Sequence, residues 1–328
     1  MGTQRYFLGK LAQAVLTLFF IITFNFFLFR ILPSDPVKIL TKGTGQRLTP
    51  AEQQQLLSDL GLDKPVFPAQ YLDYLGDTIT LDLGKSFITQ PNRDVVTVFM
   101  DKLPKTLLLV GTSTAASVAL GMVLGIYGGW RRGGAVDNSS MVGSLVLYSM
   151  PEFVLGIILL LVLGTWLDLF PSGGYASVTG DFTGFARIAD ILNHAALPWI
   201  TLTLAFVGEY YLVMRSSLLD VLGEEYITLA RAKGLREKWV LRRHAVRNAL
   251  LPMVTLIALS FGFVLGGAIT VELVFSYPGV GLLYFEALDN QDFPLLQAAF
   301  LFFSAAVLIS NLIADLLYGY LDPRVKAA

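Results

Sequence analysis

The chain has 328 residues, of which 54% are hydrophobic and 15% are charged, and its mean hydropathy is +0.62. Soluble domains carry about 25% charged residues, so this composition fits a protein that crosses a membrane several times better than a large soluble core. The net charge of −1 gives no overall attraction to nucleic acid, and the absence of cysteine excludes disulfides, thiolate metal sites and cysteine nucleophiles.

The first apolar segment, 11–31, follows Arg5 and Lys10 and therefore looks like a secretory signal at first. Its length of about 20 residues suits a spanning helix better than the shorter apolar region of a cleaved signal. No small-x-small cleavage site follows, and Pro33 and Pro36 end the helix instead. We therefore expect a retained first transmembrane helix.

Five more apolar segments are long enough to cross a bilayer, and they lie at 105–128, 141–166, 196–214, 251–271 and 296–320. Backbone groups in lipid must bond within their own segment, so all six segments are expected to be helices. Internal prolines, such as the one in the third segment, are tolerated in such helices. The predicted fold class is an all-α polytopic membrane protein with six transmembrane helices.

The basic residues predict the orientation, because Lys and Arg accumulate in short cytoplasmic loops. One set of short loops, with the two chain ends, holds most of them: Arg5, Lys10, Arg131, Arg132, Arg215, Arg231, Lys233, Arg236, Lys238, Arg242, Arg243, Arg247, Arg324 and Lys326. The opposite short loops hold Arg187 alone, and 272–294 holds no Lys or Arg. Both termini should therefore be cytoplasmic.

The connection 33–104 is expected outside the cell, because long loops are translocated largely regardless of their charge. Thr49 and Glu52 form a capping box with a proline between them, which predicts a short helix that ends before Gly61. A second short helix is expected over 69–78.

The cytoplasmic connection 215–250 is long, basic and helical in pattern. Its apolar residues recur at helical spacing and form one stripe: Leu219, Leu222, Tyr226, Leu229 and Ala230. Gly234 interrupts this stripe, and a second helix should start near Arg236. Charge that only sets the topology would explain the Lys and Arg, but not the length of the connection. We expect a short helix that docks into a groove on a soluble partner.

Several motifs in this connection resemble a known family. They are Glu225-Tyr226-Ile227, Ala230-Arg231-Ala232-Lys233-Gly234-Leu235 and Arg247-Asn248-Ala249-Leu250-Leu251-Pro252. With Leu60-Gly61-Leu62-Asp63-Lys64-Pro65 in the external loop and Pro278-Gly279 near the last span, their order is similar to that of dipeptide and oligopeptide ABC importer permeases. The resemblance covers nearly the whole chain. Thr228-Leu229-Ala230 stands where the wider importer pattern has Glu-Ala-Ala, and this variant is closer to the peptide branch.

The resemblance implies the ABC type I importer permease fold with both termini cytoplasmic. It divides the chain into a first helix at 1–32, an external loop at 33–104, a five-helix core at 105–320 that includes the coupling loop 215–250, and a tail at 321–328. The residues implied in ATPase coupling are Glu225, Tyr226, Ala230, Arg231, Ala232, Lys233, Gly234, Asn248 and Pro252. Gly234 would allow a sharp turn, and Pro252 would mark the start of the fifth span.

The resemblance also implies the assembly. The partners are a second homologous permease subunit, one or two cytoplasmic ABC ATPases, an external substrate-binding protein and the lipid bilayer, with no nucleic acid. The chain would lie in the bacterial cytoplasmic (inner) membrane as a transporter subunit rather than an enzyme, and it would bind no cofactor, because ATP and Mg are used by the ATPases. The resemblance does not decide whether the substrate is a dipeptide, an oligopeptide, a nickel complex or another solute. The family suggests a heterodimer, and a homodimer stays open.

Glu152 is a candidate for the translocation pathway, with Ser149 and Pro151 beside it in the third segment. A charge at the bilayer centre costs about 2.5–3.5 kcal/mol, so such residues usually face the bundle interior or a water-filled path. Glu152 would meet the amino group of a peptide, or it would form a structural hydrogen bond to a neighbouring helix. Glu272 is expected at an external helix end.

Two other classes of protein remain as alternatives. An ion-coupled secondary transporter would show paired intramembrane charges and broken helices in two inverted halves, and we find only isolated acids. A membrane hydrolase would need a nucleophile beside a base, and neither Gly-x-Ser-x-Gly nor His-Glu-x-x-His occurs. Gly84-Lys85-Ser86 lacks the earlier glycine of a P-loop, with Ile79 in its place, so nucleotide binding is expected on a separate chain.

Overall fold

The computed structural model describes residues 2–31, 49, 51, 54, 63–177, 182–266 and 268–321. Within these ranges the chain consists of helices and their connections, with one isolated bridge between Lys85 and Asp94 and no strand. The all-α prediction is therefore confirmed for this part of the chain. The capping box at 49–52 and its helix fall largely outside the described residues.

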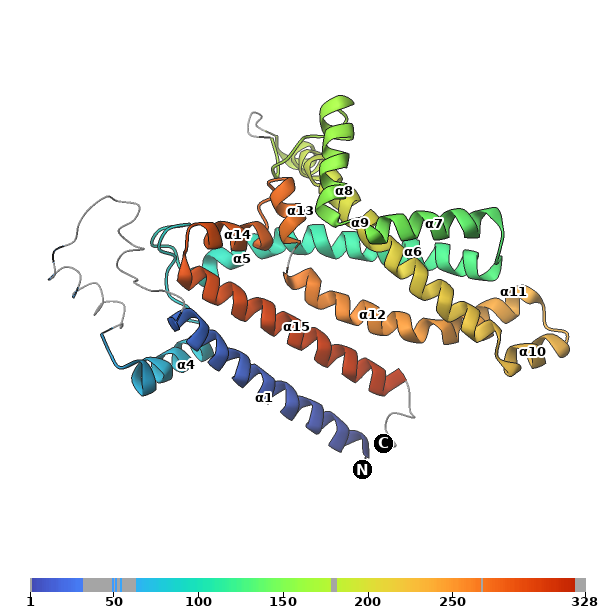
Figure 1. Ribbon diagram of the computed structural model, residues 1–328, viewed down its shortest axis with the longest axis horizontal. Helices are drawn as coiled ribbons and strands as arrows, with labels where there is room; N and C mark the ends of the chain where they lie inside the picture. Colours follow the sequence, from blue (N-terminus) through green and yellow to red (C-terminus); the bar gives the residue numbers. More distant parts are fainter. Residues whose placement is uncertain are drawn as a thin grey trace.

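Long helices lie roughly side by side and form an elongated bundle (Figure 1). On one side α1 (Gly2–Ile31) packs on α15 (Phe293–Leu321), which packs on α12 (Val246–Gly266). On the other side, α6 (Thr112–Trp130), α7 (Ala135–Ser149) and α9 (Gly184–Leu222) pack together. The short helix α10 (Glu225–Ala232) lies at one end of the bundle, and α4 (Tyr71–Thr80) lies at the other. This separation agrees with an external loop and a cytoplasmic coupling loop on opposite sides.

Four helical stretches in the described part of the chain are long and apolar enough to cross a membrane: Phe7–Arg30, Val95–Trp130, Gly184–Leu222 and Phe293–Leu316. The second stretch joins α5 (Val95–Thr106), the π-helical turn η2 (Leu107–Gly111) and α6. A fifth span results if α7 and the helix after it are counted together. The expected six spans are therefore not confirmed, because α12, which overlaps the predicted fifth segment, is not among them.

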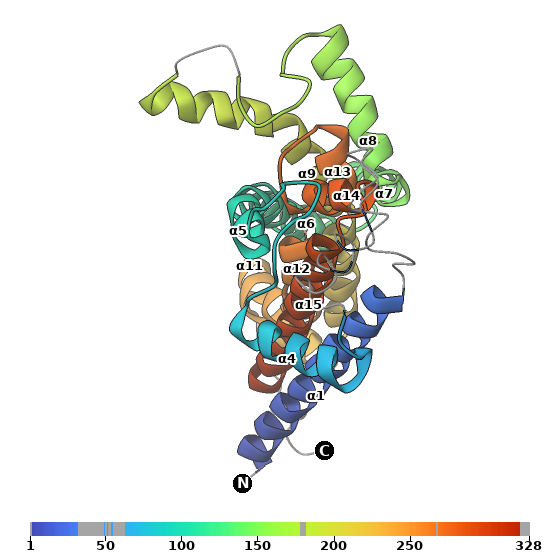
Figure 2. The same ribbon diagram turned by 90° about the vertical axis from the view of Figure 1, so that its left-hand side faces the viewer.

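The third predicted segment, 141–166, is not one continuous helix, and this expectation was wrong. Helix α7 ends at Ser149, and α8 (Glu152–Leu159) continues through the π-helical turn η3 (Leu160–Trp166) at 103° to it. Pro151 lies directly before α8 and disfavours helical backbone in the residue that precedes it. Met150 is accordingly extended, with φ −89° and ψ 126°. The bend carries α8 away from the bundle, and α8 and the first part of α9 project from it in different directions (Figure 2).

Helix α9 has 39 residues, which at 1.5 Å per residue makes it about 58 Å long. A hydrocarbon core is about 30 Å thick, so the predicted span 196–214 is only the middle of this helix. Its C-terminal half packs closely on α6 through glycines at four-residue spacing. A Cβ atom at Gly121 would lie 2.5 Å from the Cβ of Tyr210, and one at Gly125 would lie 2.8 Å from the Cβ of Met214. Small residues at this spacing let two membrane helices approach closely.

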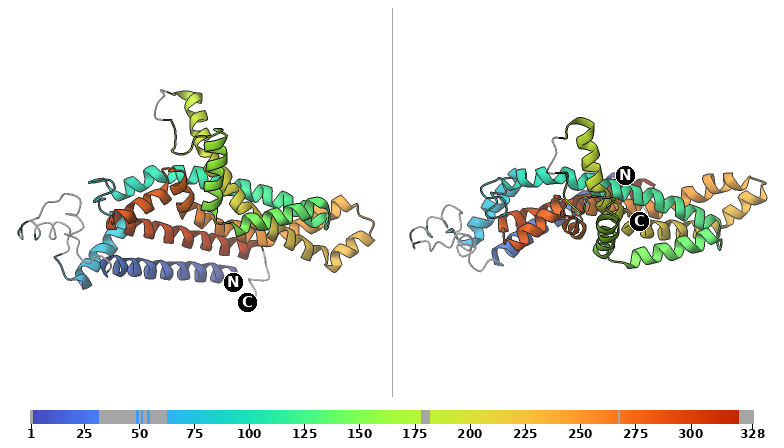
Figure 3. Two further views of the ribbon diagram at one scale, coloured as in Figure 1. Left: turned by 45° about the horizontal axis from the view of Figure 1, so that its top comes forward. Right: turned by 90° about the horizontal axis from the view of Figure 1, so that it is seen from above.

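Residues of the predicted external loop pack on the ends of the long helices. The second predicted short helix is confirmed as α4, which follows the π-helical turn η1 (Val66–Gln70). Asn25 of α1 is buried, and its Nδ2 donates to Tyr74 Oη of α4 and to the Gln297 carbonyl of α15, each at 3.0 Å. The left view of Figure 3 shows α1 along the edge of the bundle.

The last part of the chain folds back before its final span. After α12 come α13 (Ile269–Val274) and α14 (Val280–Asp289), which pack against each other. Asp292 follows, fully buried, and its carboxylate accepts hydrogen bonds from Ser86 Oγ at 2.6 Å and from the backbone N–H groups of Phe87, Ile88 and Thr89. This carboxylate fixes residues 86–89 to the start of α15.

Candidate functional site

The predicted coupling loop forms a helical hairpin at one end of the bundle. Helix α9 ends at Leu222, α10 follows, and the chain turns at Gly234 into α11 (Glu237–Trp239) and the π-helical turn η4 (Val240–Ala245), which continues into α12. Gly234 has φ +76°, a left-handed conformation that glycine adopts at no steric cost. The predicted sharp turn and the second helix after Arg236 are both present.

One face of α10 packs against the same chain. Ile227 is fully buried and Ala230 is 5% exposed. They belong to a cluster with Met214 and Leu218 of α9 and with Met253 of α12. Residues 227 and 230 are three apart, so they share one face of the helix. The sequence stripe had placed Ala230 on the ridge presented to a partner, and the structure corrects this, because α9 and α12 already cover it.

The opposite face of the hairpin carries exposed apolar side chains. Tyr226 and Leu229 on α10 are 39% and 56% exposed, Leu235 in the turn is 37% exposed, and Trp239 at the end of α11 is 56% exposed. We name these four residues the coupling surface. Exposed basic residues surround them: Arg231, Lys233, Arg236, Lys238, Arg242 and Arg243. Apolar side chains gathered within a polar rim are typical of a protein contact.

Hydrogen bonds hold the hairpin to its neighbours. Asn248 Nδ2 of α12 donates to Tyr226 Oη at 2.8 Å and to the His244 carbonyl at 2.9 Å. Arg231 Nε lies 3.2 Å from Glu237 Oε1, and its guanidinium carbon lies 5.8 Å from the ring centroid of Trp130 at the end of α6. These contacts join α6, α10, α11 and α12, so the hairpin is fixed to the bundle at several points.

The remaining predicted coupling residues have simpler surroundings. Glu225 lies in the first turn of α10, where an acid complements the helix dipole, and Ala232 and Lys233 lie at its end. Pro252 lies inside α12 and does not mark the start of the helix. The helical chain already begins at Glu237, because Val240 and Ala249 are buried against α9 and hold the residues before Pro252 in a helix.

Glu152 begins α8 at the bend and reaches a second helix. Thr270 Oγ1 of α13 donates to Glu152 Oε1 at 2.6 Å. Ser149 Oγ donates to the Leu145 carbonyl of its own helix at 2.7 Å, and Pro151 makes the turn into α8. Of the three residues, only Glu152 has a side chain that joins two separate elements, and this hydrogen bond matches the structural alternative for its role.

Besides Asp292, two further buried carboxylates were not identified as sites from the sequence. Glu272 was expected at an external helix end, but it is fully buried, and it accepts hydrogen bonds from Thr106 Oγ1 and from the Leu282 N–H, each at 2.9 Å. A Cβ atom at Gly279 would overlap the Glu272 carboxylate. The signal in the sequence was the nearby Pro-Gly turn, which lets α14 fold back over α13. The second carboxylate is Asp137, which is 1% exposed.

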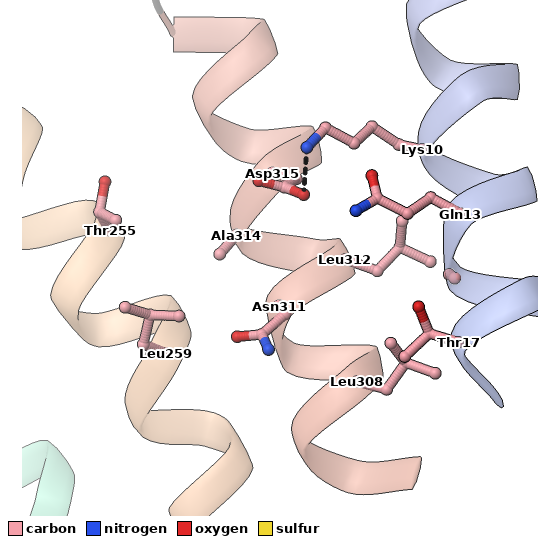
Figure 4. A pocket seen from close by; sticks show the side chains of 11 residues that line it. Lys10, Gln13, Thr17, Thr255, Leu259, Leu308, Asn311, Leu312, Ala314 and Asp315 are labelled. Carbon is pink, nitrogen blue, oxygen red and sulfur yellow. Dashed lines mark ion pairs between the residues drawn. The ribbon is translucent and has the colours of Figure 1, made fainter. Parts of the chain in front are cut away.

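A polar cavity of about 430 Å³ lies between α1, α12 and α15, away from the coupling surface (Figure 4). Lys10 Nζ of α1 and Asp315 Oδ2 of α15 lie 2.9 Å apart at this cavity. Gln13, Thr255 and Asn311 also point toward it. In the described part of the chain, no group of three or more His, Asp or Glu residues is placed to hold a metal ion.

Comparisons with known proteins identify relatives over almost the whole chain. The family model described as binding-protein-dependent transport system inner membrane component matches residues 120–327, and the model of its N-terminal region matches residues 3–110. The dipeptide transport system permease protein DppB of Escherichia coli K12 is 34% identical, with 98% of each chain covered. The oligopeptide transport system permease protein AppB of Bacillus subtilis is 32% identical, with 98% of this chain and 99% of the relative covered.

A solved structure gives independent support for the fold. The inward-facing MetNI methionine ABC transporter matches with a TM-score of 0.51 and 14% identity, over 69% of this chain and 97% of that chain. At this identity the likeness concerns the fold alone, and it agrees with the predicted ABC type I permease fold. The relatives named above give no support to an ion-coupled transporter or to a hydrolase. The chain belongs to the binding-protein-dependent transport system inner membrane component family, as a membrane permease subunit of ABC importers and not an enzyme.

Proposed function

We propose that this chain carries dipeptides or oligopeptides across the cytoplasmic membrane, driven by separate ATPase subunits. Relatives named for dipeptide and oligopeptide transport match this chain from end to end. The observation that carries the proposal is the coupling surface, because Leu229 and Trp239 are each 56% exposed on a hairpin that Ile227, Ala230 and Val240 hold to its own bundle. Such a surface needs a partner on the cytoplasmic side.

The proposed partner is an ABC ATPase with a groove that receives α10. Tyr226 and Leu229 would enter the groove, and the surrounding Lys and Arg would face its acidic rim. Glu225, Arg231, Ala232 and Lys233 would position α10, while Ala230, Gly234, Asn248 and Pro252 would support it from within the chain. ATP and Mg would be bound by the ATPase.

The hairpin's own packing supports a mechanical role. Ile227 and Ala230 contact the cluster formed by α9 and α12, and both of these helices run into the membrane bundle. A displacement of α10 by the ATPases would therefore move α9 and α12 together. Closure of the ATPases would open the pathway outward, and ATP hydrolysis would reset it.

The proposed assembly contains a second homologous permease, one or two ATPases and an external substrate-binding protein. The second permease would differ in sequence from this chain, so that the two permeases form a heterodimer. In this chain, 1–32 would be the first span with its cytoplasmic tail, 33–104 the external loop, 105–320 the permease core and 321–328 a cytoplasmic tail. Ser149 and Pro151 would shape the pathway at the α7–α8 bend. Glu152 would offer its carboxylate to the ammonium group of a passing peptide.

The experiment is uptake by proteoliposomes that contain the chain with its co-purified permease and ATPase partners. A labelled dipeptide or oligopeptide, supplied with the binding protein outside, should accumulate only when ATP is enclosed with the ATPases. Leu229→Asp should abolish uptake and the recovery of ATPase with the chain. Ile79→Asp is the matched control, because Ile79 is an 80% exposed apolar residue on the external helix α4. Uptake that needs no ATP and is abolished by dissipating an ion gradient would refute the proposal.

A further inference from the structure

Asp137, the third residue of α7, is bound by three donor residues, two on α9 and one in the turn before α7. Arg215 of α9 binds it with two nitrogens, Nε to Oδ1 at 2.6 Å and Nη2 to Oδ2 at 2.8 Å. Tyr211 Oη donates to Oδ1 at 3.1 Å, and the Gly133 N–H donates to Oδ2 at 2.9 Å. We name Asp137, Arg215, Tyr211 and Gly133 the Asp137 cluster.

The chemistry of this cluster makes a stiff connection between helices. A guanidinium that binds a carboxylate with two parallel hydrogen bonds fixes both the distance and the orientation of the two side chains. Asp137 is 1% exposed, and the side chain of Arg215 is 17% exposed. Because Asp137 is buried and Arg215 is only partly exposed, separating them would leave the Asp137 carboxylate without its cation at a high cost in free energy. The cluster therefore opposes any sliding of α7 along α9.

The helices around the cluster are closely packed. A Cβ atom at Gly128 of α6 would lie 2.9 Å from Asp137 Oδ1. A Cβ atom at Gly208 of α9 would lie 2.5 Å from the Ser144 carbonyl of α7. Helices α6, α7 and α9 lie side by side in Figure 1, next to α10. They form one packed unit, and the ion pair of Asp137 with Arg215 joins two of its helices, α7 and α9.

The unit connects the coupling surface to the bend. Met214 and Leu218, which flank Arg215 on α9, pack in one cluster with Ile227 and Ala230 of α10. At the other end of α7 lies the α7–α8 bend, where Glu152 binds Thr270. The same helix therefore carries the Asp137 cluster near its start and the candidate pathway residue just beyond its end.

We propose that Asp137 and Arg215 are positioning residues that make α7 move with α9 when α10 is displaced, so that the movement reaches Glu152 at the bend. The inference rests on the proposed coupling of α10 to an ATPase. It assigns to the ion pair the transmission of movement, in addition to any contribution to stability.

The first test measures peptide transported per ATP hydrolysed in the reconstituted complex with Asp137→Asn. The substitution keeps the shape of the side chain and removes the charge that holds Arg215. We expect the ratio to fall by about fivefold or more, the size of a typical coupling between sites. ATP hydrolysis and assembly with the ATPases should persist, because the coupling surface is unchanged. An unchanged ratio would overturn the proposal, even if the amount of assembled complex fell.

Asp315→Asn is the matched control for this substitution. It also neutralises an aspartate paired with a cation on another long helix, Lys10, at 2.9 Å (Figure 4). Because this pair joins α1 and α15, outside the unit of α6, α7 and α9, the number of peptides per ATP should stay at the wild-type value. A fall as large as that of Asp137→Asn would overturn the assignment, since any lost ion pair would then have the same effect.

The second test measures the distance between α7 and α9 directly, with and without the ion pair. The chain has no cysteine, so Val142→Cys on α7 and Asp220→Cys on α9, both exposed, can carry spin labels without further substitutions. In the otherwise wild-type complex, the distance between the labels should stay constant when ATP is added, and with Asp137→Asn it should change. A wild-type distance that changes with ATP would contradict this inference alone. Wild-type complexes without ATP-driven uptake would instead contradict the proposed function.

Discussion

The two faces of α10 should respond differently to the same substitution. Ala230 is 5% exposed and packs with α9 and α12, whereas the neighbouring Leu229 is 56% exposed. An aspartate at Ala230 would place a carboxylate without a partner in an apolar cluster, at a cost of about 3–5 kcal/mol. An aspartate at Leu229 stays in solvent, where surface substitutions change stability by about 0.5 kcal/mol or less.

The assay follows three quantities for each variant: the melting temperature of the chain purified without the ATPases, the amount of ATPase recovered with the chain, and ATP-dependent uptake. Ala230→Asp should lower the melting temperature and uncouple ATP hydrolysis from uptake, because α10 is displaced from α9 and α12. Leu229→Asp should keep the melting temperature and lose the ATPase. The reasoning is wrong if both variants transport normally, or if Leu229→Asp destabilises the chain as much as Ala230→Asp.

Three further substitutions test single contacts. Gly234→Pro should uncouple ATP hydrolysis from uptake while membrane insertion stays intact, because proline fixes φ near −65° where the turn has +76°; normal uptake would refute the role of the turn. Gly279→Ala should lower the melting temperature, because its Cβ would overlap the Glu272 carboxylate, whereas Gly76→Ala, with open space around it, should not. Asp292→Asn should make residues 86–89 more accessible to external protease, because a neutral amide holds their N–H groups and Ser86 less strongly; unchanged cleavage would contradict this.

Local patterns were sufficient to predict the helices and the hairpin. An apolar run of about 20 residues, or a glycine at a turn, can be recognised from residues that are close together in the chain. The structure has helices at each predicted segment and a sharp turn at Gly234. The basic residues likewise placed the coupling loop and the external loop on opposite sides. These features need no knowledge of which helix packs on which.

Features that depend on distant residues were not predicted. The stripe that ends at Ala230 has helical spacing, but the sequence does not say that α9 and α12 cover part of it. Glu272 meets Thr106, and Asp137 meets Arg215, across long stretches of sequence. Pro151 was interpreted as a proline tolerated within one helix. The bend was missed because the direction of α8 depends on its contact with α13, which is distant in sequence.

Cross-linking from the coupling surface tests the central claim most directly. A single Leu229→Cys in this cysteine-free chain, treated with a bifunctional reagent in native membranes, should join the chain to an ATP-hydrolysing protein and stop uptake. Ile79→Cys should give no such product. The account is contradicted if Leu229→Cys reacts only with reagents confined to the outside of the cell, or if no ATPase is ever joined to it.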